Sequence, residues 1–222
     1  MEEKLSLLLQ QNISLTGAGR TDTGVHASCM YAHFDVLETL NNLEKLSGRL
    51  NRFLPPDISI DGIFKVPDIA NARFSAISRT YQYHVHFLKN AFLNDRSWYV
   101  HKYPDTNAMI KAARLLLNFE SFGAFTRTGG AASNFICHLY DCEWIFNEYQ
   151  AIFTIKANRF LRNMVRAIVG TMMELGHGRI TLEEFEAIVQ SDDRKKAGES
   201  APPQGLFLTD IKYPNEIQLC LK

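Results

Sequence analysis

The sequence predicts an α+β fold built around a largely antiparallel sheet. Helical and strand-like segments are mixed along the 222 residues, without the sustained strand–helix–strand alternation of a doubly wound fold. The length suits one large domain or two small halves, with enough core to fold without disulfides. Four scattered cysteines without a Cys-x-x-Cys pair favour a reducing cytoplasm. No apolar run is long enough to cross a membrane, so no membrane partner is expected.

The N-terminal part of the chain predicts two helices and several strands. Leucines recur at helical spacing over residues 1–11 and again over 40–54, where two prolines end the second helix. Strict alternation over 79–87 predicts a strand with Tyr81 on its aromatic face. Shorter apolar stretches predict further strands over 13–15, 28–35 and 58–66.

The C-terminal part predicts a hairpin between helices, after an irregular connection over 89–105. Asn107 is expected to cap a helix that runs to Leu117. A helix over 159–175 would present three arginines at three- and four-residue spacing, and Thr181 would open a short acidic helix through a capping box. The expected strands cover 134–146, 151–157 and a last segment from Gly205 to about Tyr213.

A glycine-rich loop, Gly19-Arg-Thr-Asp-Thr-Gly-Val-His, joins two apolar stretches near the N-terminus. Its glycines permit a tight turn, and Asp22 lies at the tip beside Arg20 and two threonines. Two interpretations are open from these residues alone. Asp22 either caps its own backbone in a surface turn, or it is a carboxylate held in a fixed pose for chemistry.

Basic residues gather locally although the formal net charge is zero. Residues 156–166 hold four basic residues and no acid, whereas 182–193 hold five acids and no base. Arginines suit phosphate through bidentate hydrogen bonds, and a tyrosine face can stack on a base. The spacing of Cys137, His138 and Cys142 does not fit known zinc sites, so no metal is expected. The residues by themselves therefore indicate a nucleic-acid-binding surface with one reactive carboxylate.

Five stretches in register extend this interpretation by resemblance. The loop at 19–26 resembles the catalytic motif of the TruA family of tRNA pseudouridine synthases. Matching stretches follow in the same order as Ala72-Arg-Phe-Ser-Ala, Arg79-Thr-Tyr-Gln-Tyr, Lys156-Ala-Asn-Arg-Phe-Leu-Arg-Asn-Met-Val-Arg with Ile168-Val-Gly, and Gly205-Leu-Phe-Leu. Together they cover almost the whole chain, and their shared context favours the catalytic interpretation of Asp22.

The resemblance implies the pseudouridine synthase fold, with two pseudo-symmetric halves flanked by helices and an active-site cleft between them. We expect residues 1–90 to form the half with the Asp22 loop and 91–222 the half with the arginine-bearing helix, together one catalytic domain. The implied reaction isomerises uridine to pseudouridine at positions 38, 39 and 40 of the tRNA anticodon stem-loop. It needs no cofactor, because no electron or external group is exchanged. Similar proteins are homodimers, so a homodimer acting on tRNA in the cytoplasm is expected.

The resemblance also implies roles for single residues. Asp22 matches the nucleophile, Tyr81 the tyrosine that packs against the target uracil, and Arg166 the arginine that pairs with the catalytic carboxylate. Arg20 is expected to help extrude the nucleotide and hold phosphate. His26 is expected to be structural. The residues expected to bind RNA are Arg20, Thr21, Arg73, Arg79, Lys156, Arg159, Arg162 and Arg127.

One departure from the family pattern keeps an alternative open. The family begins with a strand that carries an aromatic-Gly-Trp-Gln segment, whereas Met1 of this chain stands inside the helix that follows it. A clipped chain or a misplaced start codon would explain the difference. If the strand is truly absent, the chain is expected to be a catalytically impaired RNA-binding or tRNA-chaperone protein on the same scaffold. A hydrolase that uses Asp22 as a general base is the third possibility.

Overall fold

The computed structural model describes residues 1–127, 134–218 and 220. Contacts between Cα atoms divide the chain into two compact units. Unit 1 comprises residues 1–20, 30–77 and 212–222, and unit 2 comprises residues 21–29 and 78–211. The expected division at residue 90, which concerned the two halves of the family fold, stays a prediction.

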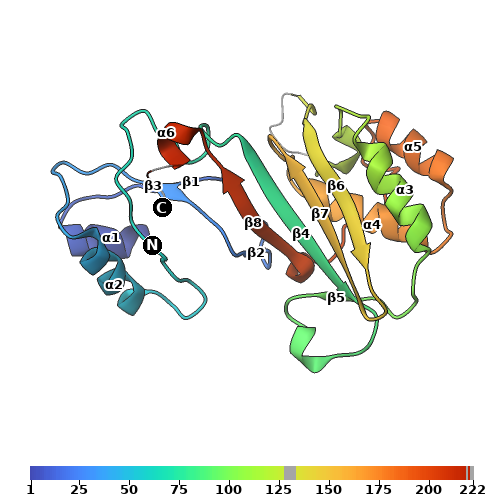
Figure 1. Cartoon of the computed structure of the whole chain (residues 1–222), viewed down its shortest axis with the longest axis horizontal. Helices are drawn as coiled ribbons and strands as arrows, with labels where there is room; N and C mark the ends of the chain where they lie inside the picture. Colours follow the sequence, from blue (N-terminus) through green and yellow to red (C-terminus); the bar gives the residue numbers. More distant parts are fainter. Residues whose placement is uncertain (128–133, 219, 221–222) are drawn as a thin grey trace. The chain divides into compact units, whose positions relative to one another are not determined.

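A six-stranded, mixed sheet forms the centre of unit 2 (Figure 1). Its strand order is β2-β8-β4-β7-β6, with β5 paired to β4. The pairs β4–β7 and β6–β7 are antiparallel, whereas β2–β8 and β4–β5 are parallel. The strands are β2 (His26–Ala27), β4 (Ser78–His86), β5 (Trp98–Tyr99), β6 (Leu139–Phe146), β7 (Gln150–Ala157) and β8 (Leu206–Lys212). The expectation of a mainly antiparallel central sheet is confirmed.

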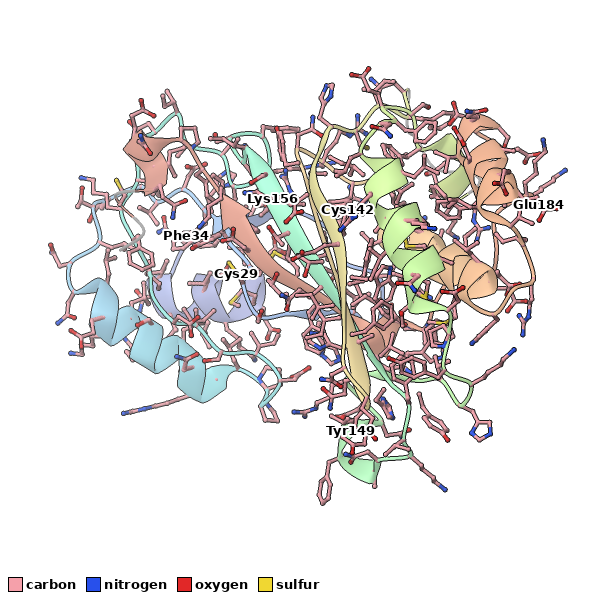
Figure 2. All side chains as sticks on the ribbon, turned by 45° about the vertical axis from the view of Figure 1, so that its right-hand side comes forward. Cys29, Phe34, Cys142, Tyr149, Lys156 and Glu184 are labelled. Atoms are coloured by element: carbon pink, nitrogen blue, oxygen red, sulfur yellow. The ribbon has the colours of Figure 1, made fainter. Side chains whose placement is uncertain are left out.

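Three helices of unit 2 share an apolar core with one face of this sheet. They are α3 (Thr106–Leu116), α4 (Met164–Gly176) and α5 (Leu182–Gln190), and α3 contacts β6 as well as the other two helices. Every second residue of β7 is buried, which places Phe153 and Ile155 in the same core as Met109 and Ile168 from the helices. Cys142 lies on this core face, whereas Lys156 lies on the opposite face of the sheet (Figure 2).

Unit 1 is smaller and has little regular strand. Helices α1 (Glu2–Leu9) and α2 (Leu43–Phe53) lie against each other, and β1 (Thr16–Gly17) pairs antiparallel with β3 (Ala32–His33). One apolar cluster among its described residues has three buried members, Leu5, Ile13 and Leu50. The remaining short elements of the chain are η1 (Ala91–Leu93), η2 (Gly123–Phe125), η3 (Pro203–Gly205) and α6 (Asn215–Gln218). No helix among the described residues is long and apolar enough to span a membrane.

Two helix boundaries differ from the sequence prediction. Asp105, not Asn107, caps α3, because its side chain accepts a hydrogen bond of 3.0 Å from the Ala108 N–H. The helix expected from residue 159 begins only at Met164, since Asn163 has a left-handed backbone with φ of 67°. The prediction that the arginines at 159 and 162 lie on this helix is therefore wrong. The capping box at Thr181 is confirmed.

The expected strands of unit 1 are mostly replaced by irregular chain. No strand forms over 58–66, and the segment 28–35 is reduced to the two residues of β3. The side chain of Asn51, on α2, accepts from the Ile60 N–H at 2.7 Å and donates to the Ile60 carbonyl at 2.9 Å. One amide side chain thus takes both backbone bonds that a neighbouring strand would have supplied.

Candidate active site

Asp22 lies in a tight turn that leads directly into β2. The Val25 N–H donates to the Asp22 carbonyl at 3.0 Å, and Gly24 closes the turn with φ of 82°. A Cβ atom at Gly24 would come within 3.1 Å of the Pro203 side chain, so both the backbone angle and the space favour glycine. The pairing of β2 with β8 anchors this turn in unit 2. The Asp22 side chain is a quarter exposed, at 25 %.

Two arginines face the Asp22 carboxylate, Arg166 from the first turn of α4 and Arg162 from the segment just before the helix. The Arg166 guanidinium donates through Nη1 to Oδ2 at 3.3 Å, and the Arg162 Nε lies 4.0 Å from Oδ1. Arg166 is the better fixed of the two, because its side chain is 18 % exposed and its Nε donates to the Ala201 carbonyl at 2.7 Å. Arg162 is 59 % exposed, so solvent screens its weaker ion pair.

Tyr81, on β4, lies within the electrostatic reach of Asp22. Its ring makes an edge-to-face contact with Phe160, with centroids 5.0 Å apart. Burial raises the pKa of the Tyr81 phenol, the positive charge of Arg79 opposes this shift, and the negative charge of Asp22 adds to it. The phenol is therefore protonated at neutral pH. The neighbouring Arg79 donates to the Asn158 carbonyl at 3.0 Å.

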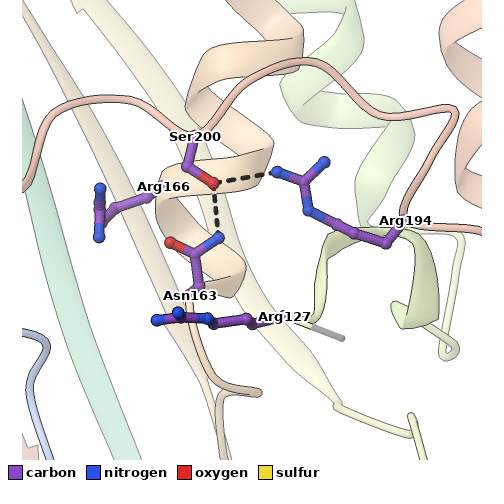
Figure 3. A pocket seen from close by; sticks show the side chains of 5 residues that line it. All are labelled: Arg127, Asn163, Arg166, Arg194 and Ser200. Atoms are coloured by element: carbon purple, nitrogen blue, oxygen red, sulfur yellow. Dashed lines mark hydrogen bonds between the residues drawn. The ribbon is translucent and has the colours of Figure 1, made fainter. Parts of the chain in front are cut away.

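An open pocket of about 400 Å³ adjoins Arg166, the ion-pair partner of Asp22, and is lined by three guanidinium groups (Figure 3). Its lining residues are Arg127, Asn163, Arg166, Arg194 and Ser200. The Ser200 hydroxyl accepts from the Asn163 amide at 2.6 Å and from the Arg194 guanidinium at 3.0 Å. Arg127 is exposed, and its backbone N–H donates to the Arg162 carbonyl at 3.0 Å. Such a pocket suits an anion with several oxygens.

The other predicted RNA-binding residues are dispersed. In unit 1, Arg20 and Arg73 line a pocket of about 290 Å³ together with Leu15, Thr16, Gly17 and Gly19. In unit 2, Lys156 lies half-buried on β7, and Arg159 donates to the Asn134 side chain at 3.0 Å. Thr21 is half-buried beside Asp22. Residues 128–133, which follow Arg127, lie outside the described residues.

His26 has structural partners in unit 2, as expected. Its ring stacks on Phe207 with centroids 4.6 Å apart, and its Nε2 lies 2.8 Å from the Asp95 carbonyl. Among the described residues, no three His, Cys, Asp or Glu side chains gather as metal ligands.

Sequence reasoning missed Arg194, Asn163 and Ser200. Arg194 stands next to two acids and two lysines, which is the pattern of an ordinary solvated turn. Asn163 directly precedes α4, where a capping role is the usual expectation, yet its side chain makes no cap and points to Ser200 instead. The only available signal was the short glycine- and proline-bearing loop after Arg194, because such loops often approach another element closely.

Comparison with known proteins gives this arrangement its context. The family model described as tRNA pseudouridine synthase matches residues 112–214. "tRNA pseudouridine synthase A" of Bacteroides thetaiotaomicron is 44% identical over 216 residues, which are 96% of this chain and 80% of the relative. The chain belongs to the tRNA pseudouridine synthase family. The relative of the same name from Parabacteroides distasonis is 43% identical, covering 98% of this chain and 86% of its own length. The one from Gloeobacter violaceus is 35% identical, covering 97% and 72%. Family membership thus extends over both units.

Proposed function

We propose that this chain is a tRNA pseudouridine synthase that isomerises uridine in the anticodon stem-loop, at positions 38, 39 and 40. In this reaction the bond between uracil N1 and ribose C1′ breaks, and a bond between C5 and C1′ forms. The C5 proton leaves to solvent and N1 gains a proton, so atoms and electrons balance without a cofactor.

Asp22 is the proposed nucleophile, and the observation that carries this role is its ion pair with Arg166. The guanidinium is fixed at Nε by the Ala201 carbonyl and at Nη1 by the carboxylate, so it orients the carboxylate toward one direction. Family membership supports the reaction class, and this pair supports the choice of residue.

Tyr81 is proposed to pack against the target uracil. Because its pKa is raised, the phenol holds its proton at neutral pH and is a poor base by itself. Replacing Tyr81 by Phe keeps the ring and removes the hydroxyl. A packing role therefore predicts that Y81F retains C5 exchange, whereas direct proton transfer by the hydroxyl predicts its loss.

Phosphate contacts are proposed for exposed arginines of both units. In unit 2, the exposed Arg162 lies 4.0 Å from the Asp22 carboxylate, and the exposed Arg127 lines the same pocket as Arg166. In unit 1, Arg20 and Arg73 line the second pocket. Guanidinium groups bind phosphodiesters strongly and position RNA without reading its sequence. The same role is proposed for Thr21, Arg79, Lys156 and Arg159, and a homodimer is proposed as the working form.

The deciding experiment measures tritium release from tRNA labelled at uridine C5. The parent chain is expected to release tritium, and Asp22→Asn is expected to lower the rate by about 10⁴-fold while tRNA binding persists. Asp141→Asn, an exposed substitution on β6, is the matched control and should leave the rate unchanged. Full release by D22N would rule out the nucleophile, and binding without release by the parent chain would favour the RNA-binding alternative.

Two further measurements address the site and the assembly. Transcripts in which cytidine replaces uridine at 38, 39 and 40 should release no tritium above background, so undiminished release would move the target elsewhere in the tRNA. Appearance of free uracil or cleaved RNA would indicate a hydrolase. Sedimentation equilibrium should give twice the chain mass of 25.3 kDa, and a monomer that remains active would contradict the homodimer.

A further inference from the structure

Arg194 closes a short loop of unit 2 around its own guanidinium group. Its Nη1 donates to the carbonyls of Ala197 at 3.1 Å and Gly198 at 3.0 Å, and its Nη2 donates to the Ser200 hydroxyl at 3.0 Å. All three acceptors belong to residues 194–201, here called the 194–201 loop. The fork of one side chain therefore sets the path of the backbone that follows it.

The end of this loop holds Arg166 at two points. The Ala201 N–H donates to the Arg166 carbonyl at 2.9 Å, and the Ala201 carbonyl accepts from the Arg166 Nε at 2.7 Å. Ala201 is buried, with 1 % of its surface exposed. Ala201 therefore holds both the backbone and the Nε of Arg166 by hydrogen bonds, and the Arg166 Nη1 donates to the Asp22 carboxylate.

The loop is also seated closely on the body of α4. A Cβ atom at Gly170 would collide with the Glu199 carbonyl, and the Gly198 N–H donates to the buried Thr171 hydroxyl at 3.0 Å. The side-chain amide of Asn163, the residue directly before α4, donates to the Ser200 hydroxyl at 2.6 Å. This close fit leaves little room for the loop to move without moving Ala201.

We propose that Arg194 is a positioning residue for the isomerisation, which orders the 194–201 loop so that the Ala201 carbonyl holds Arg166 against Asp22. The inference rests on the proposed function, because its catalytic consequence is measured as turnover. Arg194 makes no hydrogen bond to Asp22, because its guanidinium donates its three side-chain hydrogen bonds to acceptors of the 194–201 loop. Its effect is therefore expected to pass through Arg166.

The first test separates kcat from KM. Arg194→Met keeps the length of the side chain and removes the fork, and it is expected to lower kcat for tritium release by about 10- to 100-fold with KM nearly unchanged. The matched control is Arg179→Ala, because Arg179 is an exposed arginine after the end of α4 that pairs with Glu174 of that helix at 2.7 Å. R179A should keep the parent kcat. An unchanged kcat in R194M would overturn the proposal.

The second test asks whether Arg194 acts through Arg166. In an Arg166→Gln background, Arg194→Met should lower kcat by less than about 2-fold further, because the group that it positions is already absent. If the two losses multiply, Arg194 acts on the fold in general and the positioning role is wrong. Arg194→Lys keeps the charge without the fork and should rescue only a small part of kcat.

The third test needs no turnover. The Nε–H proton of Arg166, assigned by its disappearance in R166Q, should exchange with water slowly in the parent chain and at least about 10-fold faster in R194M. Unchanged exchange would contradict the proposal. This measurement distinguishes the two hypotheses: a parent chain without tritium release defeats the proposed function, and the exchange rate still decides the role of Arg194. If R194M does not fold, Ser200→Ala takes its place and is expected to lower kcat by about 3-fold. An unchanged kcat in S200A would then overturn the inference.

Discussion

The two units of the chain hold their predicted functional residues in different ways. In unit 2, β4, β6 and β7 have eight or nine residues each, and they share a large apolar core with three helices. In the described part of unit 1, the strands β1 and β3 have two residues each, and the apolar cluster between α1 and α2 has three buried side chains. Asp22, Tyr81 and Arg166 all belong to unit 2.

The difference indicates that unit 2 can hold side chains in fixed positions, whereas unit 1 can present side chains whose positions adjust to a ligand. Groups that react must be held within a fraction of an ångström, which regular elements and a dense core can provide. Arg20 and Arg73 of unit 1 are exposed and follow irregular chain, which suits contacts to a polyanion that tolerate some movement.

Removal of core side chains should expose the contrast in stability. Phe153→Ala in unit 2 is expected to cost about 3–5 kcal/mol, because the ring is fully buried and a cavity remains. Leu50→Ala in unit 1 is expected to cost about 2–5 kcal/mol, and to raise amide exchange mainly within unit 1. Exchange measured residue by residue checks both variants. Equal acceleration in both units by L50A would contradict the contrast.

The two arginines beside Asp22 should differ in rate effect although both face the carboxylate. Arg166→Gln is expected to lower kcat by about 10²- to 10³-fold, since a fixed and largely buried cation is lost. Arg162→Gln is expected to lower it only a few-fold, because its contact is longer and exposed. Single-turnover tritium release compares them. Equal losses would show that burial does not decide which arginine matters.

These sites also show how far the sequence could be interpreted. The long strand at 79–87 and the hairpin were predictable, because alternation over eight or nine residues is a strong local signal. The strand expected over 58–66 was wrong, since the Asn51 side chain satisfies Ile60 and a strand requires a partner. No local pattern reports such a long-range choice.

The start of α4 was misplaced for a related reason. Arg159 and Arg162 continue the helical spacing of Arg166, yet the left-handed backbone at Asn163 delays the helix. Arg194 could not be found at all, because its partners are two backbone carbonyls and a serine, and carbonyls leave no trace in a sequence. Asp22 could be predicted as the nucleophile only because the motif around it resembles a distinctive family motif.

A substitution of Arg73 tests whether unit 1 contributes to tRNA binding and not to the chemical step. Arg73→Gln is expected to raise KM for tRNA by about 10-fold with kcat nearly unchanged, and to reduce the salt dependence of binding by about one phosphate contact. Binding measured over a series of salt concentrations checks the slope. Lys65→Gln, another exposed basic residue of unit 1, serves as the control. A lower kcat in R73Q would show that Arg73 contributes to the chemical step, and it would contradict the assignment of unit 1 to RNA binding alone.

The smallest expected effect is a dependence of unit 2 stability on pH. His86, on β4, is buried with 3 % exposed, and its Nδ1 lies 2.9 Å from the Ser97 hydroxyl. Burial lowers the pKa of its imidazole, so the folded chain favours the neutral ring. Below the ordinary histidine pKa of about 6.5, the unfolded chain therefore binds more protons than the folded one. The free energy of unfolding should be pH-independent in this respect above that value and should fall as the pH falls below it.

The measurement compares urea unfolding of unit 2 at several values of pH between about 7.5 and 5. One titrating group contributes a slope of at most about 1.4 kcal/mol per pH unit, and His86→Gln should remove its share of the slope. An identical slope in parent and H86Q would mean that the buried imidazole does not couple folding to protons, because a group with the same proton occupancy in both states cannot make stability depend on pH.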